Sequence, residues 1–257
     1  MRILLIRHGD PDYVNDTLTE KGRHEAALLA KRAVSMNMGE CYKSPLGRAK
    51  DTATPCLEVT GKTAEILDWL QEFPAQVDLN KNPELEKAYP DVKKEGGYFL
   101  PRIAWDMVPG YWTEHEAYMD KNAWRETEVA KNSDLVEVYD HVIEEFDRFL
   151  AEHGYVREGA HYRVEKESNE TVTFFCHFGI SCVLLSHLWN VSPFVLWHCL
   201  ALAPTSVTEV VTEEREQGTA YFRGLKVGDI SHLYAGGEEP SFAARFCETY
   251  SNKEQRH

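Results

Sequence analysis

The 257-residue sequence has no uninterrupted apolar run of about 18 residues, the length that a membrane-spanning helix requires. Its first apolar stretch, residues 1–6, is too short for the core of a secretory signal peptide and is interrupted by Arg2. The chain also lacks internal repeats and low-complexity tracts. We therefore expect a globular protein of the cytoplasm with no membrane partner.

Positive charge is scarce as well. The chain has 28 Lys and Arg against 42 Asp and Glu, which gives a formal net charge of −14. Electrostatic repulsion would oppose binding to nucleic acid, so we expect no nucleic-acid partner. Any anionic ligand must instead be bound by a local cluster of positive side chains. With 43% hydrophobic residues, the chain is able to bury a sizeable core around such a site.

Cysteine is infrequent and forms no CxxC pair. Several of the cysteines lie inside apolar runs, where a free thiol packs as a small hydrophobic group. This pattern favours a reducing compartment. The six positions are Cys41, Cys56, Cys176, Cys182, Cys199 and Cys247.

What the sequence does contain is an alternation of strand-like and helix-like segments. Buried strands are predicted at residues 2–6 and 172–176, shorter strands at 40–43, 64–69 and 207–212, and an edge strand at 220–226. Helices are predicted at residues 20–36, with Thr19 as N-cap, and at 46–59, 133–153 and 177–189. This alternation predicts an α/β fold, a three-layer α/β/α sandwich with a mainly parallel sheet.

One segment departs from this alternation. Residues 73–132 are irregular and rich in Pro, Gly, Tyr and Trp. We interpret the whole chain, residues 1–257, as a single domain into which this segment is inserted. Its aromatic residues could simply fill a core, but their concentration suggests a cap that binds the organic part of a ligand.

Arginine and histidine side chains follow three of the predicted parallel strands. Arg7 and His8 end the first strand, Arg48 lies shortly after residues 40–43, and His177 ends the strand at 172–176. Ligands of such sheets bind at the carboxyl ends of the strands, so these four side chains should meet at one rim. Two arginines and two imidazoles suit the oxygens of a phosphoryl group.

The motifs around these residues resemble those of the histidine phosphatase superfamily, the phosphoglycerate mutase-like proteins. RHG at residues 7–9 is similar to the nucleophile motif of that family, SPLGRAKDTA at 44–53 to its second motif, and HFG at 177–179 to its usual HGG. LTEKGRHEA at 18–26 resembles its first helix. The resemblance covers most of the chain. It implies a phosphatase that acts on a small-molecule phosphomonoester through a phosphohistidine, with no metal ion and no other cofactor.

The chemistry of phosphoryl transfer gives each of these residues an expected role. Neutral His8 would attack phosphorus, with its second ring nitrogen bound to a nearby backbone carbonyl and with Gly9 allowing a sharp turn of the chain. Three side chains and the amides of the last predicted helix would bind the nonbridging oxygens. These ligands are Arg7, Arg48, His177 and the backbone near Gly179.

The resemblance also implies a carboxylic acid that protonates the leaving alkoxide. In the family that acid usually follows the third strand, in a pattern similar to Leu-x-Glu. Here residues 66–73 read ILDWLQEF, which makes Glu72 the candidate and Asp68 the rival. The same carboxylate would later take a proton from water during hydrolysis.

Three alternatives stay open at this point. His8, Asp10 and Asp12 form H-x-D-x-D, which could begin a metal-dependent hydrolase site, although Arg7 and Arg48 would repel a metal ion. The second alternative is a binding protein that has kept the fold without catalysis. The third is a phosphoglycerate mutase-type phosphotransferase. The connection DPDYVNDT counts against it, because this connection carries three aspartates and no Lys or Arg.

Overall fold

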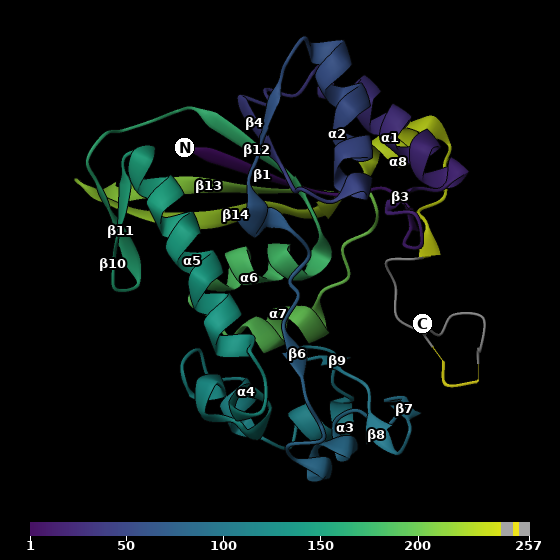
Figure 1. The fold of residues 1–257 in the computed structure, drawn as a ribbon. Helices are drawn as coiled ribbons and strands as arrows, with labels where there is room; N and C mark the ends of the chain where they lie inside the picture. The colour runs from purple at the N-terminus through teal and green to yellow at the C-terminus, as the bar shows by residue number, and fades with distance from the viewer. Residues whose placement is uncertain (243–248, 252–257) are drawn as a thin grey trace. The chain divides into compact units, whose positions relative to one another are not determined.

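The computed structural model describes residues 1–242 and 249–251, and these residues form two compact units (Figure 1). The first unit contains Met1–Glu72, Leu150–Ser181 and the described part of Ala201–His257. The second contains Phe73–Phe149 and Cys182–Leu200. The irregular segment 73–132 therefore belongs to the second unit, together with residues 133–149 and 182–200.

A mixed eight-stranded sheet forms the centre of the first unit, in the order β10-β11-β14-β13-β1-β12-β4-β5. Strands β1, β12, β4 and β5 run parallel to one another, whereas β13, β14, β11 and β10 pair antiparallel. In β12 all six residues are buried, as the continuous apolar run predicts for a central parallel strand. The strands are β1 (Arg2–Arg7), β4 (Glu40–Lys43), β5 (Ala64–Ile66), β10 (Tyr155–Glu158), β11 (His161–Val164), β12 (Thr171–Cys176), β13 (Val207–Glu216) and β14 (Thr219–Asp229).

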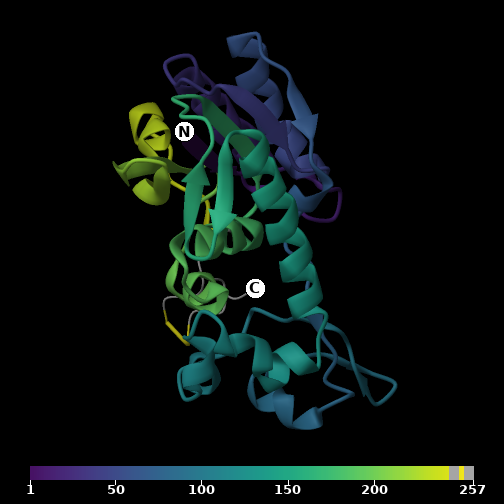
Figure 2. The same ribbon diagram turned by 90° about the vertical axis from the view of Figure 1, so that its left-hand side faces the viewer.

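The predicted α/β fold is confirmed, and the prediction of an edge strand at 220–226 is correct only in part, because β14 also pairs with β11 at Thr219 and Ala220. Strand β14 lies between β13 and β11, and the hairpin β10–β11 extends the sheet beyond it (Figures 1 and 2). The sequence signal of this hairpin is weak, because each strand is four residues long and about half polar. The buried rings of Tyr155 and Tyr162 attach the hairpin by packing edge to face on Phe222, with centroids 6.0 and 5.0 Å away.

Three helices of the first unit lie beside one another: α1 (Glu20–Ala33), α2 (Gly47–Thr60) and α8 (Ser231–Gly236) (Figure 1). The prediction of Thr19 as N-cap is confirmed, since its side chain accepts the amide of Gly22. A short ribbon of β2 (Pro11–Asp12) and β3 (Thr17–Leu18) connects β1 to α1. Apolar side chains of α1 and α2 pack on the sheet, among them Leu29, Ala33, Ala53 and Cys56 against Leu4, Ile6 and Phe175.

The second unit has short elements around an aromatic core. Trp124 packs edge to face on Tyr139 and Phe194, and Phe73 packs on Trp197 at 5.3 Å between ring centroids. These aromatic residues are therefore core residues, and a cap function of the unit stays a prediction. The elements are β6 (Gln76–Val77), η2 (Pro83–Lys87), β7 (Lys94–Glu95), β8 (Tyr98–Phe99), β9 (Arg102–Ile103), α3 (Pro109–Trp112), η3 (Glu116–Tyr118), η4 (Ala123–Glu126), α4 (Glu128–Lys131) and α7 (Pro193–Cys199).

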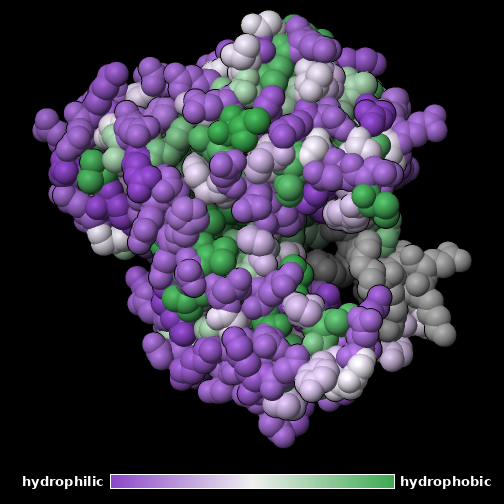
Figure 3. All heavy atoms as spheres, in the orientation of Figure 1, coloured by the Kyte–Doolittle hydropathy of each residue, from purple (hydrophilic) through white to green (hydrophobic). Residues whose placement is uncertain are grey.

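Two longer helices contribute residues to both units. They are α5 (Leu135–Glu152), which is one continuous helix in Figure 2, and α6 (Phe178–Trp189), which begins directly after His177. The face of the molecule shown in Figure 3 is mainly hydrophilic. No helix among the described residues is long and apolar enough to cross a membrane. The five described cysteines are free thiols, and Cys247 lies outside the described residues.

Candidate active site

His8 follows the last residue of β1 and is held on both sides by its neighbours. Its amide donates to the carbonyl of Cys176 at 3.0 Å, and the next amide, that of Gly9, donates to Thr52 Oγ1 at 2.9 Å. The ring nitrogen Nδ1 lies 2.7 Å from the carbonyl oxygen of Gly9. Because a carbonyl only accepts, Nδ1 carries the proton and the lone pair is on Nε2.

The charge state of His8 follows from its surroundings. The side chain is almost fully buried, at 1% exposure. Burial lowers the pKa of His8 well below its usual value, and the positive charge of Arg7 lowers it further, against the opposing hydrogen bond to Gly9. His8 is therefore a neutral imidazole at physiological pH, which is the form required of a nucleophile.

Gly9 is needed for a different reason from the one that the sequence suggested. Its φ is not in the left-handed region, so no sharp turn of that kind explains it. A Cβ at this position would instead lie 2.8 Å from the carbonyl oxygen of Gly22 in α1. The loop after β1 and the first turn of α1 thus pack at a distance that only glycine permits.

His177, at the end of β12, is paired with Ser44, at the end of β4. Both side chains are fully buried, and Nε2 of His177 lies 2.7 Å from Ser44 Oγ. Ser44 Oγ also accepts the amide of Leu46 at 3.2 Å, so its own proton is available for Nε2. Where Ser44 is the donor of this hydrogen bond, the proton of the imidazole is on Nδ1, which is buried and has no hydrogen-bond partner among the described residues. An unsatisfied buried donor of this kind fits a phosphoryl oxygen.

The two imidazoles lie side by side, with ring centroids 5.1 Å apart at an angle of 56°. Burial lowers the pKa of His177 well below its usual value, and the neighbouring His8 and Arg48 lower it further. Both rings are therefore neutral, and the formal positive charge of the site comes from the arginines.

Arg7 is held by backbone carbonyls. Its Nη1 donates to the carbonyl oxygen of Leu202, and its amide donates to that of Ser206 at 3.1 Å. The guanidinium carbon lies 5.8 Å from the centroid of the Phe178 ring, which replaces the second residue of the usual HGG. Phe178 therefore supplies an aromatic face to Arg7.

Arg48, in the first turn of α2, is only 8% exposed and has a carboxylate partner that the sequence did not reveal. Asp16 Oδ1 accepts from Arg48 Nη1 at 2.6 Å, and Asp16 Oδ2 accepts the amide of Gly47, also at 2.6 Å. The Nε of Arg48 is buried without a hydrogen-bond partner among the described residues. One edge of the guanidinium is thus fixed by Asp16, and another donor is left for a ligand.

Glu72 follows η1 (Asp68–Leu70) and meets the helix that carries the end of the HFG motif. Its Oε1 accepts the amide of Ile180 at 3.2 Å, one residue beyond Gly179 in the first turn of α6. The side chain is half-buried, whereas that of the rival Asp68 is exposed. This placement favours Glu72 as the proton donor.

The residues of the H-x-D-x-D motif are occupied otherwise. The two carboxylate oxygens of Asp10 accept from the hydroxyls of Ser241 and Thr19, and Asp12 accepts from Asn15 at 2.8 Å. Among the described residues, no group of three or more His, Cys, Asp or Glu side chains is arranged to hold a metal ion. The geometry therefore does not support the metal-site alternative at His8.

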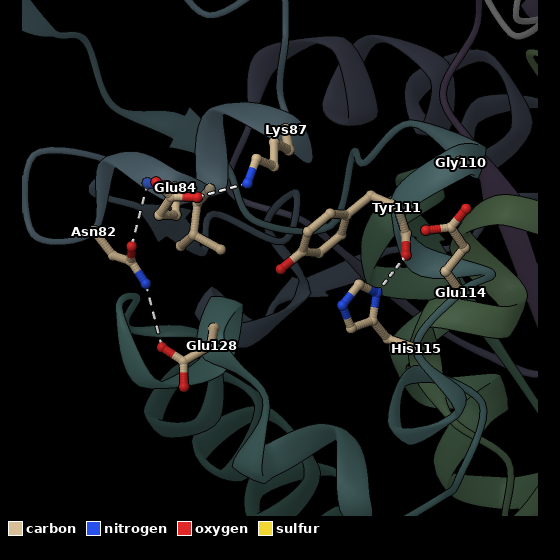
Figure 4. A pocket seen from close by; sticks show the side chains of 9 residues that line it. Asn82, Glu84, Lys87, Gly110, Tyr111, Glu114, His115 and Glu128 are labelled. Atoms are coloured by element: carbon tan, nitrogen blue, oxygen red, sulfur yellow. Dashed lines mark hydrogen bonds and ion pairs between the residues drawn. The ribbon is translucent and has the colours of Figure 1, made fainter.

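A separate cavity of about 360 Å³ lies within the second unit (Figure 4). Three carboxylates line it, those of Glu84, Glu114 and Glu128, against one lysine, Lys87, which is paired with Glu84 at 2.6 Å. This lining would repel a phosphate. The cluster around His8 therefore stays the candidate phosphoryl site.

Sequence reasoning found the side chains but missed the groups that hold them. Thr52 could have been identified from the sequence, because it belongs to the SPLGRAKDTA motif. Its hydroxyl joins α2 to the amide of Gly9. Asp16 and residues 202–206 gave no signal of this kind, because their contacts are made only in the folded chain.

Comparisons with known proteins give a family match for part of the chain and a shared fold. A family model for the histidine phosphatase superfamily (branch 1) matches residues 3–98. A probable phosphatase of Schizosaccharomyces pombe is 24% identical over 247 residues, which cover 91% of this chain and 95% of that protein. YhfR of Bacillus stearothermophilus has a similar fold, with a TM-score of 0.55, 21% identity, and coverage of 90% of this chain and 98% of that one. A phosphoserine phosphatase of Entamoeba histolytica in complex with 3-phosphoglyceric acid has a TM-score of 0.54 and 17% identity over 90% of this chain and 98% of that one. The motifs and the fold of the chain are thus similar to those of the histidine phosphatase superfamily, whose family model matches residues 3–98.

Proposed function

We propose that this phosphatase hydrolyses a small organic phosphomonoester through a phosphohistidine at His8, without a metal ion. The observation that carries the proposal is the state of His8: its ring is buried and neutral, and the Gly9 carbonyl holds its proton on Nδ1. A neutral nucleophile approaches a phosphate dianion without charge repulsion. The remaining nitrogen, Nε2, then forms the bond to phosphorus.

The other residues stabilise the charge that develops on the transferred group. Arg7, Arg48 and Nδ1–H of His177 would donate to the nonbridging oxygens, and a preorganised set of donors in a buried site is usually the largest catalytic term. Glu72 would protonate the leaving oxygen. In the second step the same carboxylate would take a proton from water as the water attacks phosphorus, so that His8 leaves as neutral imidazole.

Trapping of the intermediate tests the proposal. Rapid quench with a ³²P-labelled substrate, chosen from a panel of sugar, nucleotide and amino-acid phosphates, should yield a base-stable, acid-labile phosphoenzyme. His8→Ala should abolish both the adduct and turnover. His161→Ala changes an exposed histidine of β11 and serves as the matched control that keeps both. An acid-stable phosphoserine adduct, or full turnover by His8→Ala, would overturn the assignment.

The same panel separates hydrolysis from phosphate transfer between positions of phosphoglycerate. A mutase must bind the substrate carboxylate as well as the phosphate, but the connection between β1 and α1 contributes Asp10, Asp12 and Asp16 and no Lys or Arg. We therefore expect no interconversion of 2- and 3-phosphoglycerate above the hydrolysis rate. Efficient interconversion that depends on a bisphosphate primer would favour the mutase alternative.

A further inference from the structure

The chain directly before β13 makes three hydrogen bonds to Arg7 and His8. The amide of Thr205 donates to the carbonyl oxygen of His8 at 3.1 Å, and the carbonyl of Ser206 accepts the amide of Arg7, also at 3.1 Å. The carbonyl of Leu202 accepts from Nη1 of Arg7. Residues 202–206 thus fix the backbone of the proposed nucleophile and one guanidinium at the same time.

These residues include a tight turn with an unusual residue in its third position. The amide of Ser206 donates to the carbonyl of Ala203 at 3.0 Å, with Pro204 second and Thr205 third, as in a type II turn. Thr205 has a φ of +59°, where glycine or asparagine is the usual choice and a β-branched residue is strained. Strain of this kind persists only when surrounding contacts hold it, and it clusters at functional sites.

The contacts that hold Thr205 form a series of hydrogen bonds in which each group donates to the next. Arg32, paired with Asp229 at 2.6 Å, donates to Nδ1 of His232 at 3.5 Å. Nε2–H of His232 then donates to Thr205 Oγ1 at 2.9 Å, and the hydroxyl donates to the carbonyl of Pro204 at 2.7 Å. Burial lowers the pKa of His232 to about 4, and Arg32 contributes in the same direction, so the imidazole stays neutral near pH 7.

We propose that Thr205 is a positioning residue, whose hydroxyl, held by His232, keeps the turn in the conformation that places the His8 backbone for attack. The inference rests on the proposed function of His8 as nucleophile. Glycine would fit the positive φ better than threonine, yet threonine supplies the hydroxyl that joins the turn to α8. The side chain is fully buried, so it acts on the substrate only through His8.

Three substitutions separate positioning from stability. Thr205→Val removes the hydroxyl and keeps the shape of the side chain. We expect phosphohistidine formation to slow by about tenfold or more, with KM within about twofold of the wild type, because a small displacement of the nucleophile lowers the rate of attack. Thr205→Ser keeps the hydroxyl and should restore the rate to within about threefold of the wild type. Thr205→Gly removes the strain, so its melting temperature should equal or exceed that of Thr205→Val. Its rate of phosphohistidine formation should be as low as that of Thr205→Val.

A second variant breaks the same series of hydrogen bonds at His232. His232→Leu should slow phosphohistidine formation as Thr205→Val does, and the double variant should be no slower than either single one, because both break the same contact. Thr54→Val is the control, because it removes an exposed hydroxyl that donates to its own helix, at Lys50.

The outcomes distinguish this inference from the function on which it rests. If the wild type forms no phosphohistidine, the proposed function fails. If the wild type forms it and Thr205→Val forms it equally fast, or Thr205→Gly regains the wild-type rate, only the positioning role of Thr205 is overturned. Rate losses that simply follow the melting temperatures across all variants would also overturn it.

Discussion

Replacement of Ser44 by alanine tests how the second histidine of the site is held. Ser44 Oγ lies 2.7 Å from Nε2 of His177 and, as the donor of that hydrogen bond, would keep the imidazole proton on Nδ1, the nitrogen that has no partner among the described residues. Without the hydroxyl, the ring is able to take the other tautomer, in which Nδ1 presents a lone pair. A lone pair facing a phosphoryl oxygen repels it, whereas the N–H attracts it.

The size of the effect follows from the burial of both partners. Ser44 and His177 are each fully buried, so the loss of their hydrogen bond leaves a polar nitrogen unsatisfied at a cost of about 1–3 kcal/mol. If most of this cost falls on the transition state, kcat/KM decreases by roughly 5- to 100-fold, at about 1.4 kcal/mol per factor of ten. The amide of Leu46 also loses its acceptor at the start of α2, which should lower the unfolding free energy by about 1 kcal/mol.

Steady-state kinetics and thermal unfolding of Ser44→Ala measure the two effects separately. Ser35→Ala serves as the control, because Ser35 is exposed and its hydroxyl donates only to a backbone carbonyl at 2.9 Å, that of Arg32. If Ser44→Ala keeps kcat/KM within about twofold of the wild type while its melting temperature falls, Ser44 is structural only. Such a result would refute a role of Ser44 in fixing the tautomer of His177.

Three further predictions concern the acid, metal dependence and pH. Glu72→Gln should lower turnover by about 10²–10⁴-fold for an alkyl phosphate and much less for an activated aryl phosphate; an equal small loss for both would point to Asp68 or another acid. Excess EDTA should leave the rate within about twofold, and a loss restored by Mn²⁺ or Zn²⁺ would revive the metal-site alternative. Burial raises the pKa of Glu25 from 4.5 to about 7. Between these two pH values the folded state binds a proton that the unfolded state releases. The free energy of unfolding should therefore fall by up to about 3 kcal/mol as pH rises from about 4.5 to 7. Thermal unfolding across this range should show a loss that Glu25→Gln lacks; an equal loss in both proteins would contradict the raised pKa.

The parallel half of the fold, which contains the candidate site, could be predicted from the sequence because its sequence patterns are local. Strand β12 is a continuous apolar run, and chemically distinctive residues follow it and β1 directly. The rule that parallel strands present their carboxyl ends at one edge then brings His8 and His177 together, as the 5.1 Å between their rings confirms. The antiparallel half was less readable, because the hairpin β10–β11 is short and about half polar.

The supporting contacts were not readable, because they join residues far apart in the chain. The bond between Thr205 and His8 exists only because β13 pairs antiparallel with β1, with Val207 opposite Ile6, so that the turn before β13 lies beside the end of β1. No pattern in residues 202–206 specifies that register, which the whole sheet determines. Motifs therefore indicate the candidate reacting groups, whereas strand pairing determines how they are held.

The role of Asp16 in the structure differs from the electrostatic role that its place in the sequence suggests. In the sequence it is one of three aspartates that make the connection between β1 and α1 unfavourable to an anion. In the structure its carboxylate bridges the amide of Gly47 and the guanidinium of Arg48. Burial alone would raise the pKa of Asp16, but these two hydrogen bonds outweigh burial and lower it. Asp16 thus stays ionised and holds Arg48 at the start of α2. An aspartate that the sequence counts only as repulsion serves to position one of the two arginines expected to bind the phosphoryl group.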